Sequence, residues 1–360
     1  MSYSRLLLDF FRTLDESGIT YCVVGRSESL PDVVASDVDI VVSDQDLRKI
    51  PEKLHQVCRE NNASIAQAIR HDVNATCFVV SWYADCHASP CFIALDVCSD
   101  FYGNRRLLMR ADDMLAARIR ALDSAGRDRG FFIARPEKEF IYYLLKKIDR
   151  HAVKKEEAVH LSNVWKSEPT DCLRELEYIW PTHHSMLLES AARNDSWDKV
   201  VEALAALSAH LGRASAAVQM KANLTELLRI VDRLTFPTGL HIAFLGPDGS
   251  GKSTTIQSVI TAIFPLFRRV TKFHLRPRFG DNRKQNEQVT DPHSQPVRGI
   301  LLSCIKLAYF FLDYTLGWWI LVRPILTRSG LVIFDRYYHD ILVDNVRYSS
   351  RFSPPSFRAP

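Results

Sequence analysis

The sequence predicts an α/β protein with two separate sheets joined by a mainly helical segment. Three observations lead to this prediction. Short β-rich runs alternate with helical periodicity over the first hundred residues, helical periodicity dominates residues 153–235, and a glycine-rich loop follows an apolar run near residue 240. We expect a mixed sheet in residues 1–104, a mainly helical connector in 105–239, an incomplete parallel sheet in 240–348 and an unstructured tail in 349–360.

Composition and charge exclude several classes of protein. The 360 residues are 47% hydrophobic and 24% charged, which excludes disordered and collagen-like chains. The net charge of +4 is too small for a protein that coats nucleic acid, so no nucleic-acid partner is expected. Residues 241–360 hold 16 Lys and Arg against 8 Asp and Glu, a net charge of +8, whereas residues 1–240 carry −4. Such a basic segment suits a polyphosphate ligand, and an acidic partner surface is the alternative.

The first domain alternates helix and strand. Gly18 ends an expected helix over residues 4–17, and a second helix is expected over 46–62. The β-rich apolar runs predict four strands, at Tyr21–Val24, Asp39–Val42, Phe78–Trp82 and Phe92–Val97.

The connector is expected to be mostly helical. Helical periodicity covers residues 105–122, and Pro136 begins a second helix that ends at Arg150. A single strand is predicted between them, at Phe131–Ala134. Residues 153–235 read almost entirely as helix, and the sequence FPTG at 236–239 ends it. No residue pattern in the connector indicates chemistry.

Cysteine use and the N-terminus indicate a cytoplasmic protein. None of the eight cysteines forms a C-x-x-C pair, and several lie in apolar runs, so we expect reduced and mostly buried thiols. The N-terminus lacks the basic start and long apolar core of a signal peptide. Ile300–Val322 is long enough to span a bilayer, but Lys306 and Asp313 fall on one face of it. We expect a long buried helix with a polar stripe, and peripheral membrane contact is the alternative.

A phosphate-binding loop is predicted at the start of the last domain. The pattern G-x-x-x-x-G-K-[ST] is complete between an expected strand and an expected helix. Glycines allow backbone N–H groups to point at phosphate oxygens, and the helix N-terminus adds partial positive charge. Lys252 can reach the outer phosphates and Ser253 can bind Mg²⁺. The expected nucleotide-binding residues are Gly246, Asp248, Gly249, Ser250, Gly251, Lys252, Ser253 and Thr254.

Two further segments are expected to face this loop. Asp335 ends an apolar strand, where a carboxylate can hold Mg²⁺ through its water shell, and Arg336 follows it. Arg276 and Arg278 lie on a proline-stiffened loop after another strand, and their guanidinium groups suit an acceptor phosphate or sugar. A helix cap at Asp335 and a solvated basic loop at 276–278 are the alternatives.

The motifs of the last domain resemble those of a known protein family. GPDGSGKST with a later strand ending in DRYY resembles the thymidylate kinase-like branch of the nucleoside monophosphate kinases. HLRP and IFDRYYHDILVDNVRY resemble a subgroup found with bacterial polysaccharide-biosynthesis genes. The resemblance covers residues 240–350 and implies ATP as donor and Mg²⁺ as cofactor. It also implies that Arg276 and Arg336 bind the acceptor phosphate, and that Asp248 faces the acceptor.

The sequence differs from this family in one feature that affects the expected kinase activity. The family places a lid and two more core strands after the DRYY segment, and the lid brings arginines to the transferred phosphate. This chain ends at residue 360, after a stretch that reads as an unstructured tail. We therefore expect a truncated product, and a catalytically weak, regulatory ATP-binding protein is the alternative to an active kinase.

A second site is predicted in the first domain. Gly25 and Ser27 follow the strand YCVV, and Asp37 and Asp39 project together because residues i and i+2 of a strand point the same way. Asp96 lies within the apolar run FIALDVC. Adjacent carboxylates repel one another unless a cation lies between them, so a divalent metal is the expected ligand.

This arrangement resembles the polymerase-β-type nucleotidyltransferases, which combine a Gly-Ser turn, D-x-D and a third carboxylate. The resemblance implies that Asp37, Asp39 and Asp96 hold Mg²⁺ and that the turn at Gly25 and Ser27 supports the nucleotide phosphates. Arg26 interrupts the Gly-Ser pair. A phosphate contact and a solvated helix face are the alternatives for Lys146 and Lys147, and the solvated face is preferred.

Together the two sites predict a cytoplasmic protein that combines a kinase-like domain with a nucleotidyltransferase-like domain. The expected reaction is Mg-ATP-dependent phosphoryl transfer to a nucleoside monophosphate or sugar phosphate, with a coupled nucleotidyltransferase-like domain. A place in polysaccharide precursor synthesis is implied by the resemblance alone. An interaction scaffold that docks to a membrane or polysaccharide assembly through Ile300–Val322 is a further alternative.

Overall fold

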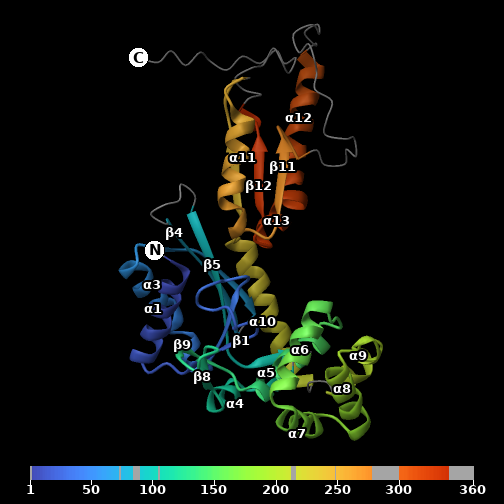
Figure 1. The fold of residues 1–360 in the computed structure, drawn as a ribbon. Coiled ribbons are helices and arrows are strands. Elements are labelled where there is room, and N and C mark those ends of the chain that lie inside the picture. The colour runs from blue at the N-terminus through green and yellow to red at the C-terminus, as the bar shows by residue number, and fades with distance from the viewer. Residues whose placement is uncertain are drawn as a thin grey trace. The chain divides into compact units, whose positions relative to one another are not determined.

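The computed structural model describes residues 2–72, 74–83, 90–103, 106–211, 216–247, 249–277 and 300–339. The chain divides into two compact units, Met1–Leu227 and Leu228–Pro360, which are considered separately (Figure 1). The predictions made for Asp248, Arg278 and the tail at 349–360 lie outside the described residues.

The first unit is built on a seven-stranded mixed sheet with strand order β3-β4-β5-β2-β1-β9-β8. Strand β2 runs parallel to β5, and β1 runs parallel to β9, whereas the other pairs are antiparallel. The strands are β1 (Tyr21–Val24), β2 (Val38–Val42), β3 (Ser64–Asp72), β4 (Ala75–Tyr83), β5 (Pro90–Cys98), β8 (Ile119–Leu122) and β9 (Asp128–Ile133). A separate two-stranded ribbon pairs β6 (Phe101–Gly103) with β7 (Arg106–Met109).

Two helices cover one face of this sheet, as Figure 1 shows. Helix α1 (Tyr3–Glu16) begins at Ser2, whose hydroxyl accepts a hydrogen bond from the Arg5 N–H. Its apolar residues recur three and four apart, and they pack with those of α3 (Ile50–Glu60) on alternate residues of the strands, such as Ile40 and Leu95. The alternate positions Asp39 and Asp96 therefore face the other side of the sheet.

The other face is covered by α5 (Pro136–Asp149), which also organises a helical bundle. Pro136 is the first helical residue, as predicted. The remaining helices of this unit are α2 (Asp44–Leu47), α4 (Ala111–Ala116), α6 (Lys155–Ser167), α7 (Pro169–Ile179), α8 (Thr182–Asn194) and α9 (Asp198–His210). Helices α4 and α6 to α9 share one apolar core with α5, in which Trp165 and Trp180 are buried. Helix α10 (Ala216–Thr235) follows and runs across the boundary between the units.

The sheet extends beyond residue 104, into the segment expected to be a helical connector. The expected helix over residues 105–122 is wrong, because β7, the short α4 and β8 occupy that stretch. Pairing of β8 with β9 overrides the helical periodicity. Arg118 and Arg120 both lie over the Phe132 ring, with guanidinium carbons 3.9 and 4.0 Å from its centroid.

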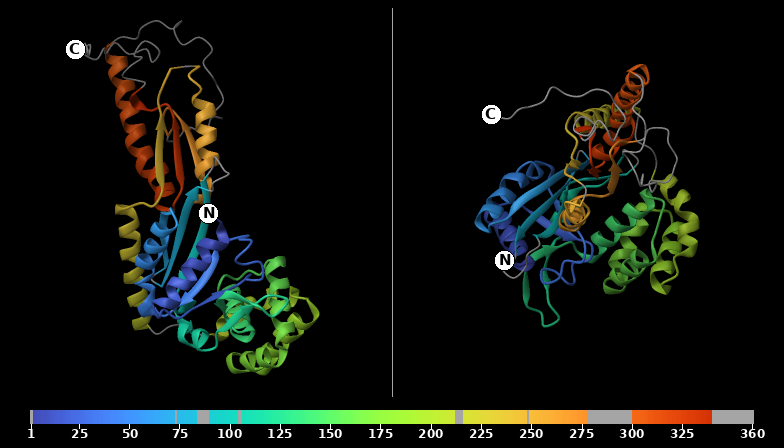
Figure 2. Two further views of the ribbon diagram at one scale, coloured as in Figure 1. Left: turned by 60° about the vertical axis from the view of Figure 1, so that its left-hand side comes forward. Right: turned by 90° about the horizontal axis from the view of Figure 1, so that it is seen from above.

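The second unit contains a three-stranded parallel sheet in the order β10-β12-β11. Helix α11 packs on one face of the sheet and the run α12–η2–α13 on the other (Figure 2). The elements are β10 (Leu240–Phe244), α11 (Lys252–Ile263), the 3₁₀ turn η1 (Phe264–Leu266), β11 (Val270–His274), α12 (Ile300–Gly317), the π-helical turn η2 (Trp318–Val322), α13 (Arg323–Thr327) and β12 (Leu331–Asp335). The expected strands and the helix after the loop are therefore present.

Helix α12 is apolar but only partly covered. Asp313 is buried, whereas Ile305, Phe311 and Leu312 are exposed, so the expected long buried helix is correct for one side only. Among the described residues, no helix is long and apolar enough to cross a membrane.

The cysteines whose surroundings the structure describes form no disulfide bond. They are Cys22, Cys58, Cys77, Cys91, Cys98 and Cys172.

Candidate functional site

The predicted phosphate loop lies between β10 and α11. Gly249 and Gly251 have φ values of +81° and +79°, a region that favours glycine, and a Cβ atom added at either would meet nothing within 4 Å. Their backbone therefore borders open space. The Lys252 Nζ donates hydrogen bonds to the carbonyl oxygens of Gly246 and Pro247, at 2.7 and 2.6 Å. The ammonium group thus lies across the loop, where a phosphate would meet it.

Asp335 lies at the middle of the sheet edge that carries this loop. It pairs in register with Phe244, the last residue of β10, and with His274, the last residue of β11. Its Oδ2 lies 4.0 Å from the His274 Nδ1. Its Oδ1 is buried, and no described residue donates a hydrogen bond to it. A buried carboxylate oxygen of this kind suits a metal-bound water.

The remaining predicted donors lie in the first turn of α11. Ser253 and Thr254 are both exposed there, directly after Lys252. A hydroxyl and a carboxylate are oxygen donors of the type that Mg²⁺ prefers. The residues present therefore fit Mg²⁺ held by Ser253 and, through water, by Asp335.

Arg276 has a structural partner. Its Nη1 lies 3.3 Å from the Oδ2 of Asp313 on α12, and the Asp313 side chain is only 1% exposed. The guanidinium also lies over the rings of Tyr309 and Phe310. The arginine predicted to bind an acceptor therefore fixes the loop after β11 to α12.

Two further contacts hold the same loop. The Tyr314 hydroxyl donates a hydrogen bond to the Leu275 carbonyl oxygen. Gly317 approaches Pro277 so closely that a Cβ atom at 317 would lie 2.5 Å from the proline Cβ. The loop is therefore held against the C-terminal half of α12.

Arg336 is buried, and its φ value is +72°. Its backbone N–H donates to the carbonyl oxygen of Phe244 at 3.0 Å, which ties the end of β12 to the end of β10. We expected its side chain to project over the cleft, and its burial makes a positioning role for the strand ends the better interpretation.

In the first unit, Asp39 and Asp96 occupy paired positions on the parallel strands β2 and β5. Asp37 precedes β2 by one residue and is exposed. Burial raises the pKa of Asp39, and the charges of Asp96 and Asp37 raise it further, while Lys146 opposes them. The charges of Asp96 and Asp37 therefore act on Asp39.

Lys146 on α5 faces this carboxylate pair. Its Nζ lies 3.4 Å from the Oδ1 of Asp39, and its side chain is 17% exposed. Lys147 is buried and pairs with Glu157 at 2.5 Å. The preferred expectation of a solvated helix face is wrong for both lysines, because α5 packs this side against the sheet and α6.

In this structure the positive charge beside the carboxylates comes from a lysine. Among the described residues, no three His, Cys, Asp or Glu side chains converge closely enough to hold a metal ion as they stand. The Lys146 ammonium supplies positive charge beside Asp39 instead. Asp37, Asp39 and Asp96 supply oxygen donors of the type that Mg²⁺ prefers, although their spacing in this structure does not form a metal site.

The turn at Gly25 lies against Asp39. Gly25 has a φ value of +86°, and a Cβ atom added there would lie 3.7 Å from the Asp39 Oδ2. The buried Glu139 accepts a backbone hydrogen bond from Gly25 and lies 2.9 Å from the His160 Nε2. Burial raises the pKa of Glu139, and its bond to His160 opposes that rise.

Sequence reasoning missed Glu139 and His160. A glutamate in the first turn of a helix that begins with proline is ordinarily a solvated cap, so only the apolar residues around Glu139 could have indicated its burial. Two other turn residues have partners: Arg26 pairs with Glu156 at 3.3 Å, and the Ser27 carbonyl oxygen accepts from Arg129 at 3.3 Å.

Comparison with known proteins identifies no family. The sequence matches no protein-family model and no curated protein. Two solved structures from Helicobacter pylori are similar, a candidate nucleotidyltransferase and the protein JHP933, each at 11% identity and a TM-score of 0.28. Each match covers 63% of this chain and 96% of the other. A TM-score this low carries no functional argument, so function is inferred from this chain's own geometry.

Proposed function

We propose that the second unit binds the Mg²⁺ complex of ATP at the loop 246–253 and transfers a phosphoryl group to a small phosphorylated acceptor. The observation that carries this proposal is the register of the sheet. It sets Asp335 between the strand that leads into the glycine loop and the strand that ends at His274. One oxygen of Asp335 is buried and receives no hydrogen bond from a described residue.

Each residue of the loop has a defined task in this proposal. The backbone N–H groups around Gly249 and Gly251 bind phosphate oxygens, and the N-terminus of α11 adds favourable charge. The Lys252 ammonium leaves the loop carbonyls and contacts the outer phosphates. Ser253 and, through water, Asp335 would hold Mg²⁺, and the ion would supply positive charge against the phosphate oxygens.

The acceptor proposed is a nucleoside monophosphate or a sugar phosphate, in a step of polysaccharide precursor synthesis. This part of the proposal depends on the resemblance of the HLRP and DRYY segments to the thymidylate kinase-like subgroup. Because Arg276 is paired with Asp313, the structure favours a positioning role for it and leaves acceptor binding to other groups at the sheet edge.

We propose a second activity, nucleotidyl transfer, for the first unit. The register of Asp39 and Asp96 favours it, since the paired carboxylates and the close Gly25 turn lie on one face of the sheet. Asp37, Asp39 and Asp96 would hold Mg²⁺, which would activate an acceptor hydroxyl for attack on the α-phosphate of a nucleoside triphosphate, with pyrophosphate as the leaving group. Glu139 and His160 would hold the turn in place.

The two proposed activities transfer different phosphates of ATP, so labelled ATP distinguishes them. The whole chain is incubated with Mg²⁺ and ATP labelled in either the γ- or the α-phosphate, together with a panel of nucleoside monophosphates and sugar phosphates. Transfer of the γ-label that Lys252→Ala abolishes and Asp39→Asn preserves supports the kinase. Transfer of the α-label with the opposite sensitivity supports the nucleotidyltransferase.

The matched control is Lys166→Ala, which removes an exposed lysine paired only with Asp195. ATP binding without any labelled product would contradict the kinase and support a regulatory ATP-binding unit.

A further inference from the structure

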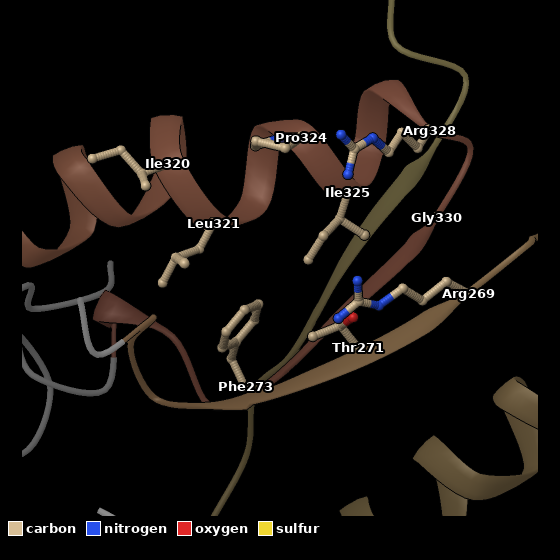
Figure 3. Close-up of a pocket in the computed structure, with 9 residues that line it drawn as sticks. All are labelled: Arg269, Thr271, Phe273, Ile320, Leu321, Pro324, Ile325, Arg328 and Gly330. Carbon is tan, nitrogen blue, oxygen red and sulfur yellow. The ribbon is translucent and has the colours of Figure 1, made fainter. Parts of the chain in front are cut away.

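A cavity in the unit that holds the phosphate loop has no role in the functions above. It has a volume of 380 Å³ and lies between β11 and the run η2–α13. Its walls are mainly apolar, and Figure 3 shows Leu321 and Ile325 pointing from the helical side toward Phe273 on the strand. A volume of this size lies within the range of pockets that bind small molecules, about 300–1,000 Å³.

Two arginines reach this cavity from opposite walls. Arg269 immediately precedes β11, Arg328 follows α13, and in Figure 3 both guanidinium groups turn toward the space beside Ile325. Both side chains are exposed, and neither forms an ion pair with a carboxylate among the described residues. Two guanidinium groups without a carboxylate partner, at the entrance of one cavity, favour an anion that both can contact.

A third polar group lies deeper in the cavity. Arg269, Thr271 and Phe273 alternate along the strand and therefore line the same face. The Thr271 hydroxyl is buried, and no described residue forms a hydrogen bond with it. A buried hydroxyl without a partner is unfavourable, and a ligand oxygen would satisfy it.

We propose that this cavity binds an amphiphilic anion, a molecule with a phosphate headgroup and a single alkyl chain. The headgroup contacts Arg269 and Arg328 and accepts a hydrogen bond from Thr271. The alkyl chain lies along Phe273, Leu321 and Ile325. Apolar walls alone would favour a neutral ligand and the arginines alone a free phosphate, whereas the two together fit a molecule that carries both parts.

This site differs from the phosphate loop. Arg269 and Gly330 precede the first residues of β11 and β12, whereas the loop follows the last residue of β10. Since the three strands are parallel, the arginines lie at the opposite end of the sheet from Lys252 and Asp335. Occupation of the cavity therefore does not depend on the proposed kinase activity.

Calorimetric titration of the whole chain with decyl phosphate, below its micelle-forming concentration, tests the proposal. Lys252→Ala serves as the background, so that phosphate binding at the loop does not contribute. Decyl maltoside supplies a similar tail with a neutral headgroup, and inorganic phosphate supplies the headgroup alone. We expect saturable binding of decyl phosphate, and binding at least about tenfold weaker for each of the other two probes.

Variants then assign the binding to the cavity. We expect Arg269→Gln with Arg328→Gln to weaken binding at least about tenfold, and Arg269→Lys with Arg328→Lys to restore part of it. We expect Thr271→Val, which removes the hydroxyl at constant size, to weaken binding about fivefold.

The matched control is Lys272→Gln with Arg59→Gln, which removes the same charge from two other exposed positions. Thermal unfolding of every variant reports whether the unit remains folded. Equal loss of affinity in the control, equal binding of decyl maltoside, or no saturable binding by the parent would each overturn the proposal.

Discussion

Asp39 and Asp96 lie at paired positions on the parallel strands β2 and β5, and the ammonium group of Lys146 lies 3.4 Å from Asp39. A buried carboxylate beside a second carboxylate is unfavourable without a cation. In this structure the lysine on α5 supplies that cation. Lys146 and a divalent metal would therefore compete for Asp39.

Replacement of Lys146 should strengthen metal binding. In Lys146→Gln the carboxylates lose the competing ammonium, so we expect affinity for Mn²⁺, used as a spectroscopic substitute for Mg²⁺, to rise several-fold. Asp39→Asn should lose this binding. Electron paramagnetic resonance of free Mn²⁺ measures both, in a Ser253→Ala background that removes a ligand of the other site.

Lys49→Gln is the control for Lys146, since Lys49 is an exposed lysine paired with Asp46. Equal Mn²⁺ affinity in the parent and Lys146→Gln would show that the lysine does not compete for the carboxylates.

Arg276 should matter more for stability than for acceptor binding. Arg276→Ala leaves the buried Asp313 without its ion-pair partner, and removal of one member of a buried pair costs about 3–5 kcal/mol. We expect faster hydrogen exchange in β12 and α12, with partial recovery in Arg276→Lys. Arg269→Ala, at an exposed arginine that forms no ion pair with a described residue, should change stability by less than about 0.5 kcal/mol.

An unchanged exchange rate together with weaker acceptor use in Arg276→Ala would contradict this interpretation. It would restore the acceptor role that the sequence indicated.

The first unit should lose stability in alkaline solution through Cys172. Burial raises the pKa of this thiol from 9.0 to about 12, with nearby carboxylates adding to the rise. Below pH 9 both native and unfolded chains hold the proton. Between pH 9 and 12 only the unfolded chain releases it, so stability falls as pH rises.

Urea unfolding of the parent and Cys172→Ala at pH 8 and pH 10.5 measures this effect. Other groups titrate in both proteins, so the informative quantity is the difference between them. We expect the parent's advantage over Cys172→Ala to shrink at the higher pH. A constant difference would show that the thiol is not held protonated in the folded state.

Local sequence signals predicted the elements that carry the two candidate sites. The apolar runs at Tyr21–Val24 and Leu331–Asp335 correspond to β1 and β12, and the glycine loop lies between β10 and α11 as expected. These features depend on residues close together in the chain, where periodicity and turn chemistry decide the structure. Asp39 lies between Val38 and Ile40, which are both buried, and neighbouring residues of a strand point to opposite faces. Local sequence therefore also indicates which face of the sheet carries Asp39.

The remaining features depend on long-range contacts, which periodicity does not report. Strand β8 forms by pairing with β9 in a stretch that reads as helix. Arg276 contacts Asp313, which is 37 residues away in the sequence, and Lys146 contacts Asp39, which is 107 residues away. Arg276 and Lys146 would ordinarily be solvated, and each acquires its carboxylate partner only when the fold is complete.

Binding of ATP by the intact chain, with and without Mg²⁺, tests the central claim most directly. We expect tight binding that depends on Mg²⁺ in the parent, a loss of at least about tenfold in Lys252→Ala, and loss of the Mg²⁺ dependence in Ser253→Ala. Lys166→Ala should bind as the parent does. Equal ATP affinity in the parent and Lys252→Ala would contradict the assignment of the loop 246–253 as the nucleotide-binding site.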